Sequence, residues 1–223
     1  MSAVSEKRRA DIKVVIIGDA FVGKTTFIRR YLERTFSENL GTVGAAFFLK
    51  HWHDCNIAIW DTAGEERFSG LSSFYCRDAS AAIVAFDLCN QRSFDLLSER
   101  YLPLLDAAKE DCLLCVTGMK LDLVKDKARV DRHQAEKFAM QVNGARYKDA
   151  TESEVRKPYF ETSSLTGENV DKVFEFIFST LLPLGEDGSI QHKASQQSRG
   201  VVHVDADDQL GNTQSGRSRS CCK

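Results

Sequence analysis

Residues 18–25 (GDAFVGKT) carry the residue types that bind a phosphate chain. They match the pattern G-x4-G-K-S/T and follow an apolar run that is typical of a buried strand. The glycines let successive backbone N–H groups face phosphate oxygens, and the N-terminus of the next helix adds positive potential. We expect Lys24 to contact the outer phosphates and Thr25 to ligate magnesium, so the sequence predicts binding of a nucleoside triphosphate.

A second magnesium ligand is expected at the end of another strand, and Asp61 in residues 59–64 (IWDTAG) has that position. The other interpretation of a lone aspartate after a strand is a helix cap. The alternating strand before Asp61, together with the phosphate loop, favours the cation ligand.

Residues 117–123 (TGMKLDL) differ by one residue from the N-K-x-D pattern of a guanine-binding loop. Guanine presents two adjacent donors, N1–H and the 2-amino group, and a single carboxylate accepts from both. Adenine has an acceptor at N1, so Asp122 predicts specificity for guanine.

Apolar runs alternate with helical patterns along the chain, which is typical of a doubly wound α/β sheet with right-handed crossovers. The predicted buried strands are 12–17, 81–86, 112–116 and 159–161. The predicted helices are 25–33, 93–108, 131–142 and 170–182. Segments 45–50 and 55–60 flank a polar HWHD and predict an antiparallel hairpin at one sheet edge.

The composition indicates one domain with a polar tail. The chain has 223 residues, of which 43% are apolar, and its formal net charge of −2 indicates no general attraction to nucleic acid. The N-terminus lacks the apolar segment of a secretory signal, so a cytosolic protein with reduced cysteines is expected. We predict a flexible N-terminus at 1–10, a domain at 11–183 with a polar insertion at 143–157, and a disordered tail at 184–223.

These motifs, in this order, resemble those of the Rab branch of the Ras-like small GTPases. Residues 60–68 (WDTAGEERF) are one letter from the Rab sequence WDTAGQERF, and residues 42–44 (TVG) resemble the Thr-Ile-Gly of switch I. Three further segments, SSFYCRDA, FDL and ETSSLTGENV, are similar to the Rab sequences YYRGA, YDI and ETSAKTGENV. The resemblance implies a P-loop NTPase G domain, with a mostly parallel six-stranded sheet, one antiparallel edge strand and helices on both faces.

The resemblance also implies GTP or GDP and Mg²⁺ as ligands. Thr42 would ligate magnesium and sense the γ-phosphate, Gly64 would sense it from switch II, and Phe36 would lie against the base. The bulky side chain of Phe21 is expected to point outward, over the nucleotide or toward a partner. The expected nucleotide-binding residues are Gly18, Asp19, Ala20, Phe21, Val22, Gly23, Lys24, Thr25, Thr26, Phe36, Thr42, Asp61, Gly64, Met119, Lys120, Asp122, Ser163, Ser164 and Leu165. The expected magnesium ligands are Thr25, Thr42 and Asp61, and the expected catalytic residues are Lys24, Thr42 and Glu65.

Met119 departs from the family pattern, in which an asparagine contacts guanine N7 and ties this loop to the phosphate loop. Losing one or two neutral hydrogen bonds of about 0.5–1.5 kcal/mol each predicts affinity about tenfold to a hundredfold lower. The other interpretation is that Met119 fills the core while the alkyl stem of Lys120 still covers the base. Leu165 replaces a lysine, whereas Ser164 can still offer its backbone N–H to guanine.

Glu65 departs from the glutamine that orients the attacking water in the family. A carboxylate accepts hydrogen bonds but does not donate them, and its charge lies near an anionic centre, so we expect slow intrinsic hydrolysis and a changed dependence on an activating protein. The other interpretation is that Glu65 points to solvent and the activating protein supplies the catalytic groups.

Cys221 and Cys222 resemble Rab C-termini that receive two geranylgeranyl groups, and two lipid chains give stable yet reversible anchoring. The tail from Gly185 has five basic and five acidic residues, so lipid rather than charge is expected to hold it on a membrane. Cys112 and Cys115 form a C-x-x-C within an apolar run and are interpreted as core residues. His51 and His53 are interpreted as residues of a solvated turn.

The resemblance implies a GTP/GDP-regulated switch in vesicle trafficking and protein transport. Implied partners are an exchange factor, a GTPase-activating protein, a Rab escort protein, a dissociation inhibitor and effectors, with no nucleic acid. The implied location is the cytoplasmic face of intracellular membranes (endosomal, phagosomal or Golgi), with a soluble cytosolic pool. One alternative is a weakly hydrolysing or nucleotide-loose pseudo-GTPase that acts as a membrane-anchored scaffold. A P-loop kinase is disfavoured because WDTAG is present and an arginine-rich lid segment is absent from the sequence.

Overall fold

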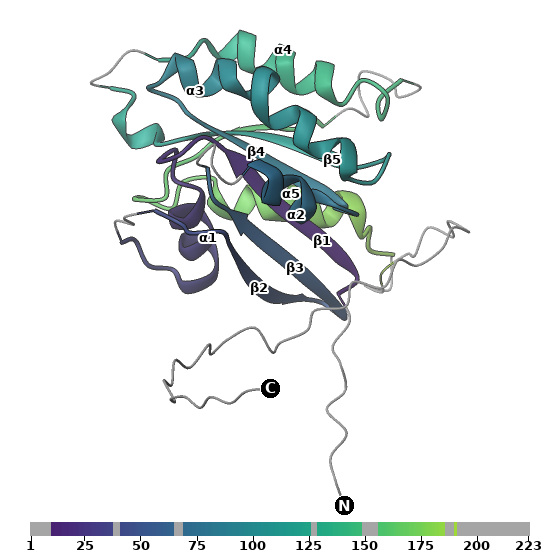
Figure 1. Cartoon of the computed structure of the whole chain (residues 1–223). Coiled ribbons are helices and arrows are strands. Elements are labelled where there is room, and N and C mark those ends of the chain that lie inside the picture. The colour runs from purple at the N-terminus through teal and green to yellow at the C-terminus, as the bar shows by residue number, and fades with distance from the viewer. Residues whose placement is uncertain are drawn as a thin grey trace, which may run out of the picture.

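A six-stranded sheet forms the centre of the protein (Figure 1). The computed structural model describes residues 10–37, 41–64, 69–125, 129–148, 156–185 and 190, without the side chains of 69–72. The strands are β1 (Ile12–Gly18), β2 (Ala45–Trp52), β3 (Cys55–Thr62), β4 (Ala81–Asp87), β5 (Leu113–Met119) and β6 (Tyr159–Glu161). Their order is β2-β3-β1-β4-β5-β6, with β2 antiparallel to β3 and every other pair parallel, which confirms the predicted sheet.

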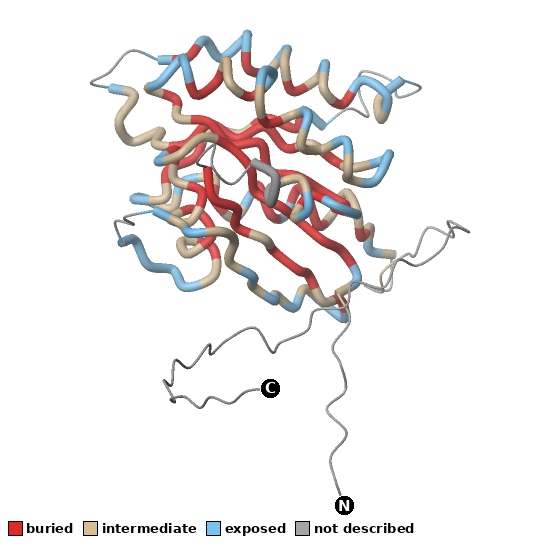
Figure 2. The backbone as a smooth tube through the Cα atoms, in the orientation of Figure 1, coloured by how far each residue is buried: buried red, intermediate tan, exposed pale blue. Residues whose placement is uncertain are grey.

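Both faces of the sheet are covered by helices. On one face Val14 and Ile16 of β1 belong to a core that includes residues of α1 (Lys24–Glu33) and α5 (Val170–Leu181). Val15 and Ile17 belong to a second core, with residues of α2 (Ser69–Cys76), α3 (Gln91–Leu96) and α4 (Arg132–Val142). The continuous apolar run of β1 therefore reflects burial on both faces, and Figure 2 shows the buried residues concentrated along the central strands.

The edge strand β2 differs from the central strands. Its residues alternate between half-buried and exposed, and the hairpin with β3 follows the predicted boundaries to within two residues. His53 is exposed at the turn of this hairpin, as predicted, whereas His51, also exposed, lies within β2 and pairs with Asn56. Because only one face of β2 packs on the core, the strand leaves apolar side chains such as Phe47 and Leu49 partly exposed.

The segment predicted as a helix over 93–108 is helical from Gln91 to Ala107, but it is not one α-helix. The α-helical part, α3, ends at Leu96 and is followed by a π-helical turn at Leu97–Tyr101 and a 3-10 helix at Leu102–Ala107. Pro103 lies in the first turn of that 3-10 helix and has no N–H to donate to an earlier carbonyl, which disfavours a continuous α-helix. Helix α2 was absent from the predicted elements.

Cys112 and Cys115 pack on opposite faces of the sheet. Cys115 is buried with the α1 and α5 side, whereas Cys112 packs against the α3 and α4 side. Burial raises the pKa of both thiols to about 12. The interpretation of this C-x-x-C as core packing is therefore confirmed.

Candidate functional site

The phosphate loop runs from the end of β1 to the start of α1. Lys24 is buried, and its ammonium donates to the carbonyl oxygens of Gly18 and Asp19, each at 2.8 Å. Burial lowers the pKa of Lys24 to about 8, while Asp61 and Asp19 act in the opposite direction. A Cβ on Gly18 would lie 2.1 Å from the carbonyl oxygen of Ala85, so only glycine lets β1 and β4 meet at this turn.

Three predicted magnesium ligands converge beside this loop. The hydroxyl oxygen of Thr25 lies 2.6 Å from that of Thr42 and also 2.6 Å from Oδ2 of Asp61, to which it donates. The Asp61 side chain is buried, and its Oδ1 has no hydrogen-bond partner among the described residues. Burial raises the pKa of Asp61, although the Thr25 hydrogen bond and the Lys24 charge oppose that shift.

This donor set suits magnesium. Mg²⁺ prefers oxygen ligands and is usually bound by one or two carboxylates together with substrate phosphates. The hydroxyls of Thr25 and Thr42 and the carboxylate of Asp61 supply such oxygens, and a cation would satisfy the unpartnered Oδ1. The residues present therefore fit the ion that the sequence predicts.

The guanine-loop residues follow β5. The Ser163 hydroxyl donates to Oδ1 of Asp122, which orients the carboxylate that we expect to read the base. Lys120 adopts a left-handed conformation with φ of 63°, and its ammonium lies 2.7 Å from Oδ2 of Asp87. The backbone N–H of Leu121 donates to the carbonyl of Thr162, so the two loops are joined through their main chains.

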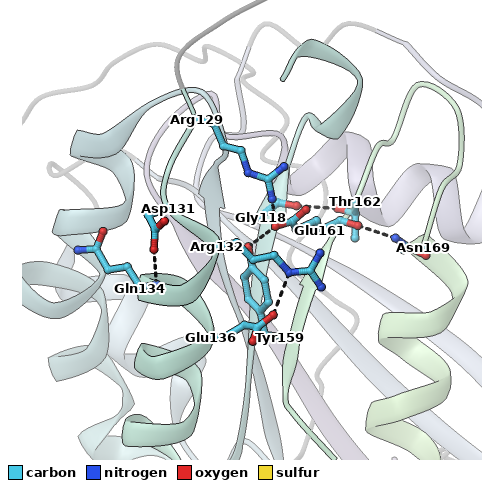
Figure 3. Close-up of polar contacts among 10 residues, drawn as sticks. All are labelled: Gly118, Arg129, Asp131, Arg132, Gln134, Glu136, Tyr159, Glu161, Thr162 and Asn169. Carbon is cyan, nitrogen blue, oxygen red and sulfur yellow. Dashed lines mark hydrogen bonds and ion pairs between the residues drawn. The ribbon is translucent and has the colours of Figure 1, made fainter. Parts of the chain in front are cut away.

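A polar network around β6 supports the loop that follows this strand and contains residues 162–165 (Figure 3). Glu161 contacts Arg129, accepts a hydrogen bond from the Tyr159 hydroxyl at 2.8 Å, and through its carbonyl accepts from the Asn169 amide at 2.8 Å. Thr162 donates to the Gly118 carbonyl at 3.2 Å. These contacts link the end of β6 to β5 and to the start of α5. They position residues 163–165, which lie between β6 and α5 in the chain.

One cavity of about 550 Å³ joins the phosphate loop to the guanine loop. Fifteen of the predicted residues line it: Ala20, Phe21, Val22, Gly23, Lys24, Thr25, Thr26, Phe36, Thr42, Gly64, Met119, Lys120, Asp122, Ser164 and Leu165. Gly18, Asp19, Asp61 and Ser163 lie directly behind this lining, each within hydrogen-bond distance of a lining residue. Glu65, Cys221 and Cys222 lie outside the described residues.

Apolar side chains border the cavity. Phe21 is 70% exposed, Phe36 45% and Leu165 50%. The exposure of Phe21 agrees with the expectation that its ring points outward. Phe21 also has φ of 61°, a left-handed conformation that costs a residue other than glycine about 1–3 kcal/mol. The surrounding loop therefore holds this aromatic residue in an unfavourable backbone conformation at the mouth of the site.

Four residues at the site were not in the predicted set. Gly41, Thr62 and Leu123 line the cavity. Thr62 lies in the motif IWDTAG and Leu123 in TGMKLDL, so membership of these motifs could have predicted both residues. The Tyr101 hydroxyl lies within hydrogen-bond distance of the Asp19 side chain and of the Gly64 carbonyl, and no sequence pattern indicated this residue.

Comparison with known proteins identifies the family. The model of the Ras family matches residues 13–182, which is most of the chain and includes every described residue of the cavity. The chain belongs to the Ras family of small GTPases. Its relatives within this family include the Ras-related proteins Rab-20, Rab-21 and Rab-12, which confirms the predicted Rab branch.

The similarity extends over nearly the whole GTPase. This chain is 36% identical to the human Ras-related protein Rab-20, over 96% of this chain and 99% of that protein. The mouse Rab-20 is 35% identical over the same shares, and the human Ras-related protein Rab-12 is 38% identical over 75% of this chain and 66% of its own length. Residues 42–47 (TVGAAF), the insertion before β6 and the two terminal cysteines favour the Rab-20 subfamily, and the comparison agrees.

Ras-family proteins bind GTP or GDP together with Mg²⁺, and the family membership implies GTPase activity for this chain. In the part of the chain that the structure describes, none of the helices has the length and apolar character needed to cross a bilayer.

Proposed function

We propose that this Rab-type GTPase binds GTP and GDP with magnesium in the cavity between the phosphate and guanine loops, and acts as a switch in membrane trafficking. The convergence of the oxygens of Thr25, Thr42 and Asp61 beside buried Lys24 carries the proposal. It supports a phosphate-magnesium site at one end of a cavity whose other end holds Asp122.

Each end of the cavity has a distinct role in this proposal. Lys24 and the loop N–H groups neutralise the phosphates, and bound magnesium supplies further charge neutralisation during phosphoryl transfer. Thr42 would hold the cation from switch I, and Gly64 would offer its N–H to the γ-phosphate. At the opposite end, the Asp122 carboxylate accepts from the two donors of guanine while Ser163 holds its orientation.

The chemical step is hydrolysis of GTP to GDP and phosphate by an attacking water. Glu65 stands where the family has a glutamine, and we propose that it makes the intrinsic reaction slow because a carboxylate accepts from the water but donates nothing toward the transferring phosphoryl group. Slow hydrolysis prolongs the GTP-bound state and so prolongs contact with effectors.

Membrane attachment and partners complete the proposal. We propose that Cys221 and Cys222 are geranylgeranylated and place the GTPase on the cytoplasmic face of an endosomal, phagosomal or Golgi membrane, with a soluble cytosolic pool. Rab proteins act with exchange factors, activating proteins and effectors. A Rab escort protein would present the chain for prenylation, and a dissociation inhibitor would extract it from the membrane.

The test begins with the nucleotide that the purified chain carries. We expect chromatography of the extracted ligand to give GDP or GTP, and single-turnover assays with magnesium to show slow, measurable hydrolysis. A Lys24→Ala variant should lose the bound nucleotide. Recovery of ATP instead would contradict the guanine assignment. Full occupancy without detectable hydrolysis, or a chain that binds no nucleotide, would favour the membrane-anchored scaffold.

A further inference from the structure

The π-helical turn at Leu97–Tyr101 brings a tyrosine to the phosphate end of the site. The backbone N–H of Leu102 donates to the carbonyl of Leu97, five residues earlier, which is the spacing of a π-helix. Such a turn contains one more residue than an α-helical turn, so the residues after it face a different direction. Tyr101 is only 3% exposed and points into the protein toward Asp19 and Gly64.

The Tyr101 hydroxyl has two acceptors within reach. It lies 3.0 Å from the Gly64 carbonyl oxygen and 3.2 Å from Oδ1 of Asp19. The same Asp19 oxygen also accepts from the backbone N–H of Ala20 at 2.8 Å. Because a tyrosine hydroxyl carries a single proton, the Gly64 carbonyl and the Asp19 carboxylate compete for one hydrogen bond.

Gly64 packs directly against the phosphate loop. A Cβ at this position would lie 2.5 Å from the backbone nitrogen of Ala20 and 2.6 Å from the ammonium nitrogen of Lys24. The Gly64 backbone is therefore close to the group that we expect to bind the outer phosphates. The Gly64 carbonyl belongs to the peptide after Cα and its N–H to the peptide before it, and the two peptides are joined through the rotations about Cα. A hydrogen bond that fixes the carbonyl in this tightly packed position therefore limits the directions open to the N–H.

We propose that Tyr101 is a positioning residue that orients Gly64 and thereby sets the preference of the site for a nucleoside triphosphate over the diphosphate. This inference rests on the proposed function, in which the Gly64 N–H meets the γ-phosphate. When the hydroxyl donates to the Gly64 carbonyl, that residue is held for the γ-phosphate. When it donates to Asp19, Gly64 loses this support. The diphosphate has no γ-phosphate, so its binding does not depend on which of the two acceptors receives the Tyr101 proton.

The experiment uses the full-length chain and Tyr101→Phe, which removes the hydroxyl and keeps the buried ring. Dissociation constants are measured for GDP and for a non-hydrolysable GTP analogue. Loss of one hydrogen bond predicts analogue binding weaker by about threefold to tenfold, with GDP binding changed by less than about twofold. The matched control is Tyr147→Phe, which removes a hydroxyl that donates to the Arg156 carbonyl at 3.2 Å, and which should change neither constant.

A double-mutant cycle with Asp19→Asn separates positioning from a general loss of structure. A carboxylate is a stronger acceptor than a neutral amide, so Asp19→Asn should leave the Tyr101 proton to Gly64 and raise the preference for the analogue. Part of that rise comes from removing the negative charge of Asp19, and this part should be the same in the Tyr101→Phe background. We expect the rise to be larger with Tyr101 present than with Tyr101→Phe.

Two results would overturn the inference. One is an equal weakening of GDP and analogue binding by Tyr101→Phe, and the other is the same effect of Asp19→Asn in both backgrounds. Failure of the unmodified chain to bind either nucleotide would instead overturn the proposed function. The two failures are distinguishable, because the second appears before any variant is compared.

Discussion

The hydroxyl oxygen of Thr162 lies 3.4 Å from the thioether sulfur of Met119. Both side chains are buried, and the same hydroxyl lies 3.2 Å from the Gly118 carbonyl. A thioether is a weak acceptor, so the end of β5 is held to the neighbouring loop mainly through main-chain contacts. Met119 fills the core and also lines the cavity, so it replaces a polar contact to the base with apolar packing.

Met119→Asn should tighten GDP binding by about tenfold to a hundredfold, because an amide side chain can hydrogen-bond the base and the phosphate loop. The nucleotide-free variant should lose about 1–3 kcal/mol of unfolding free energy, since Met119 is 1% exposed and the amide would be buried without the base. Calorimetry with GDP and urea unfolding measure these effects. Met140→Asn makes the same change at a half-buried position of α4, outside the cavity lining, and is the control that should leave GDP affinity unchanged. Unchanged GDP affinity would assign Met119 to core filling alone.

Glu65→Gln should raise the single-turnover rate of GTP hydrolysis by about tenfold, because an amide both accepts from the attacking water and donates toward the phosphoryl oxygens. The rate is measured with magnesium and no activating protein. Glu110→Gln is the control, because it makes the same change of charge at an exposed position elsewhere on the surface. Equal rates for Glu65→Gln and the unmodified chain would mean that Glu65 does not act on the reacting groups.

Chelation of magnesium by EDTA should speed release of GDP by about tenfold or more, because the oxygens of Thr25, Thr42 and Asp61 would hold the cation beside the phosphates and the cation would neutralise their charge. In Asp61→Asn release should be fast with magnesium and respond little to EDTA, since the carboxylate next to Thr25 is lost. Release is followed with radiolabelled GDP. Asp106→Asn, at an exposed site, should keep the full response. A full response in Asp61→Asn would show that Asp61 is not a ligand.

Cys112 and Cys115 should resist alkylation by iodoacetamide at pH 8 in the folded protein. Burial raises the pKa of each thiol to about 12, so at pH 8 both stay protonated, and the thiolate is the reactive form. Cys89 is half-buried like Cys112 but belongs to neither core, so it should react first of the three, and all three should react after unfolding in urea. Peptide mass spectrometry locates the labels. Rapid labelling of Cys112 and Cys115 in the folded state would contradict their assignment to the core.

The elements could be predicted from sequence wherever burial alone decided the pattern. Residues 14–17 of β1 and 81–86 of β4 are all apolar because helices cover both faces of the sheet, and α5 has a clear apolar face. The helix after Asn90 could not be predicted in detail. Its opening turns fit an α-helix, but the π-turn before Leu102 and the 3-10 turn with Pro103 depend on packing against the rest of the domain.

The sequence by itself determined the phosphate loop, the aspartate of WDTAG and the guanine loop, because each depends on residues that are neighbours along one short stretch of backbone. Only the tertiary structure decided how these stretches meet. Thr25 and Asp61 are separated by 36 positions, Thr162 and Met119 by 43, and Tyr101 and Asp19 by 82. Contacts at such separations follow from strand order and helix packing, which place distant side chains at the same edge of the sheet. For the same reason the role of Tyr101 became visible only in the folded chain.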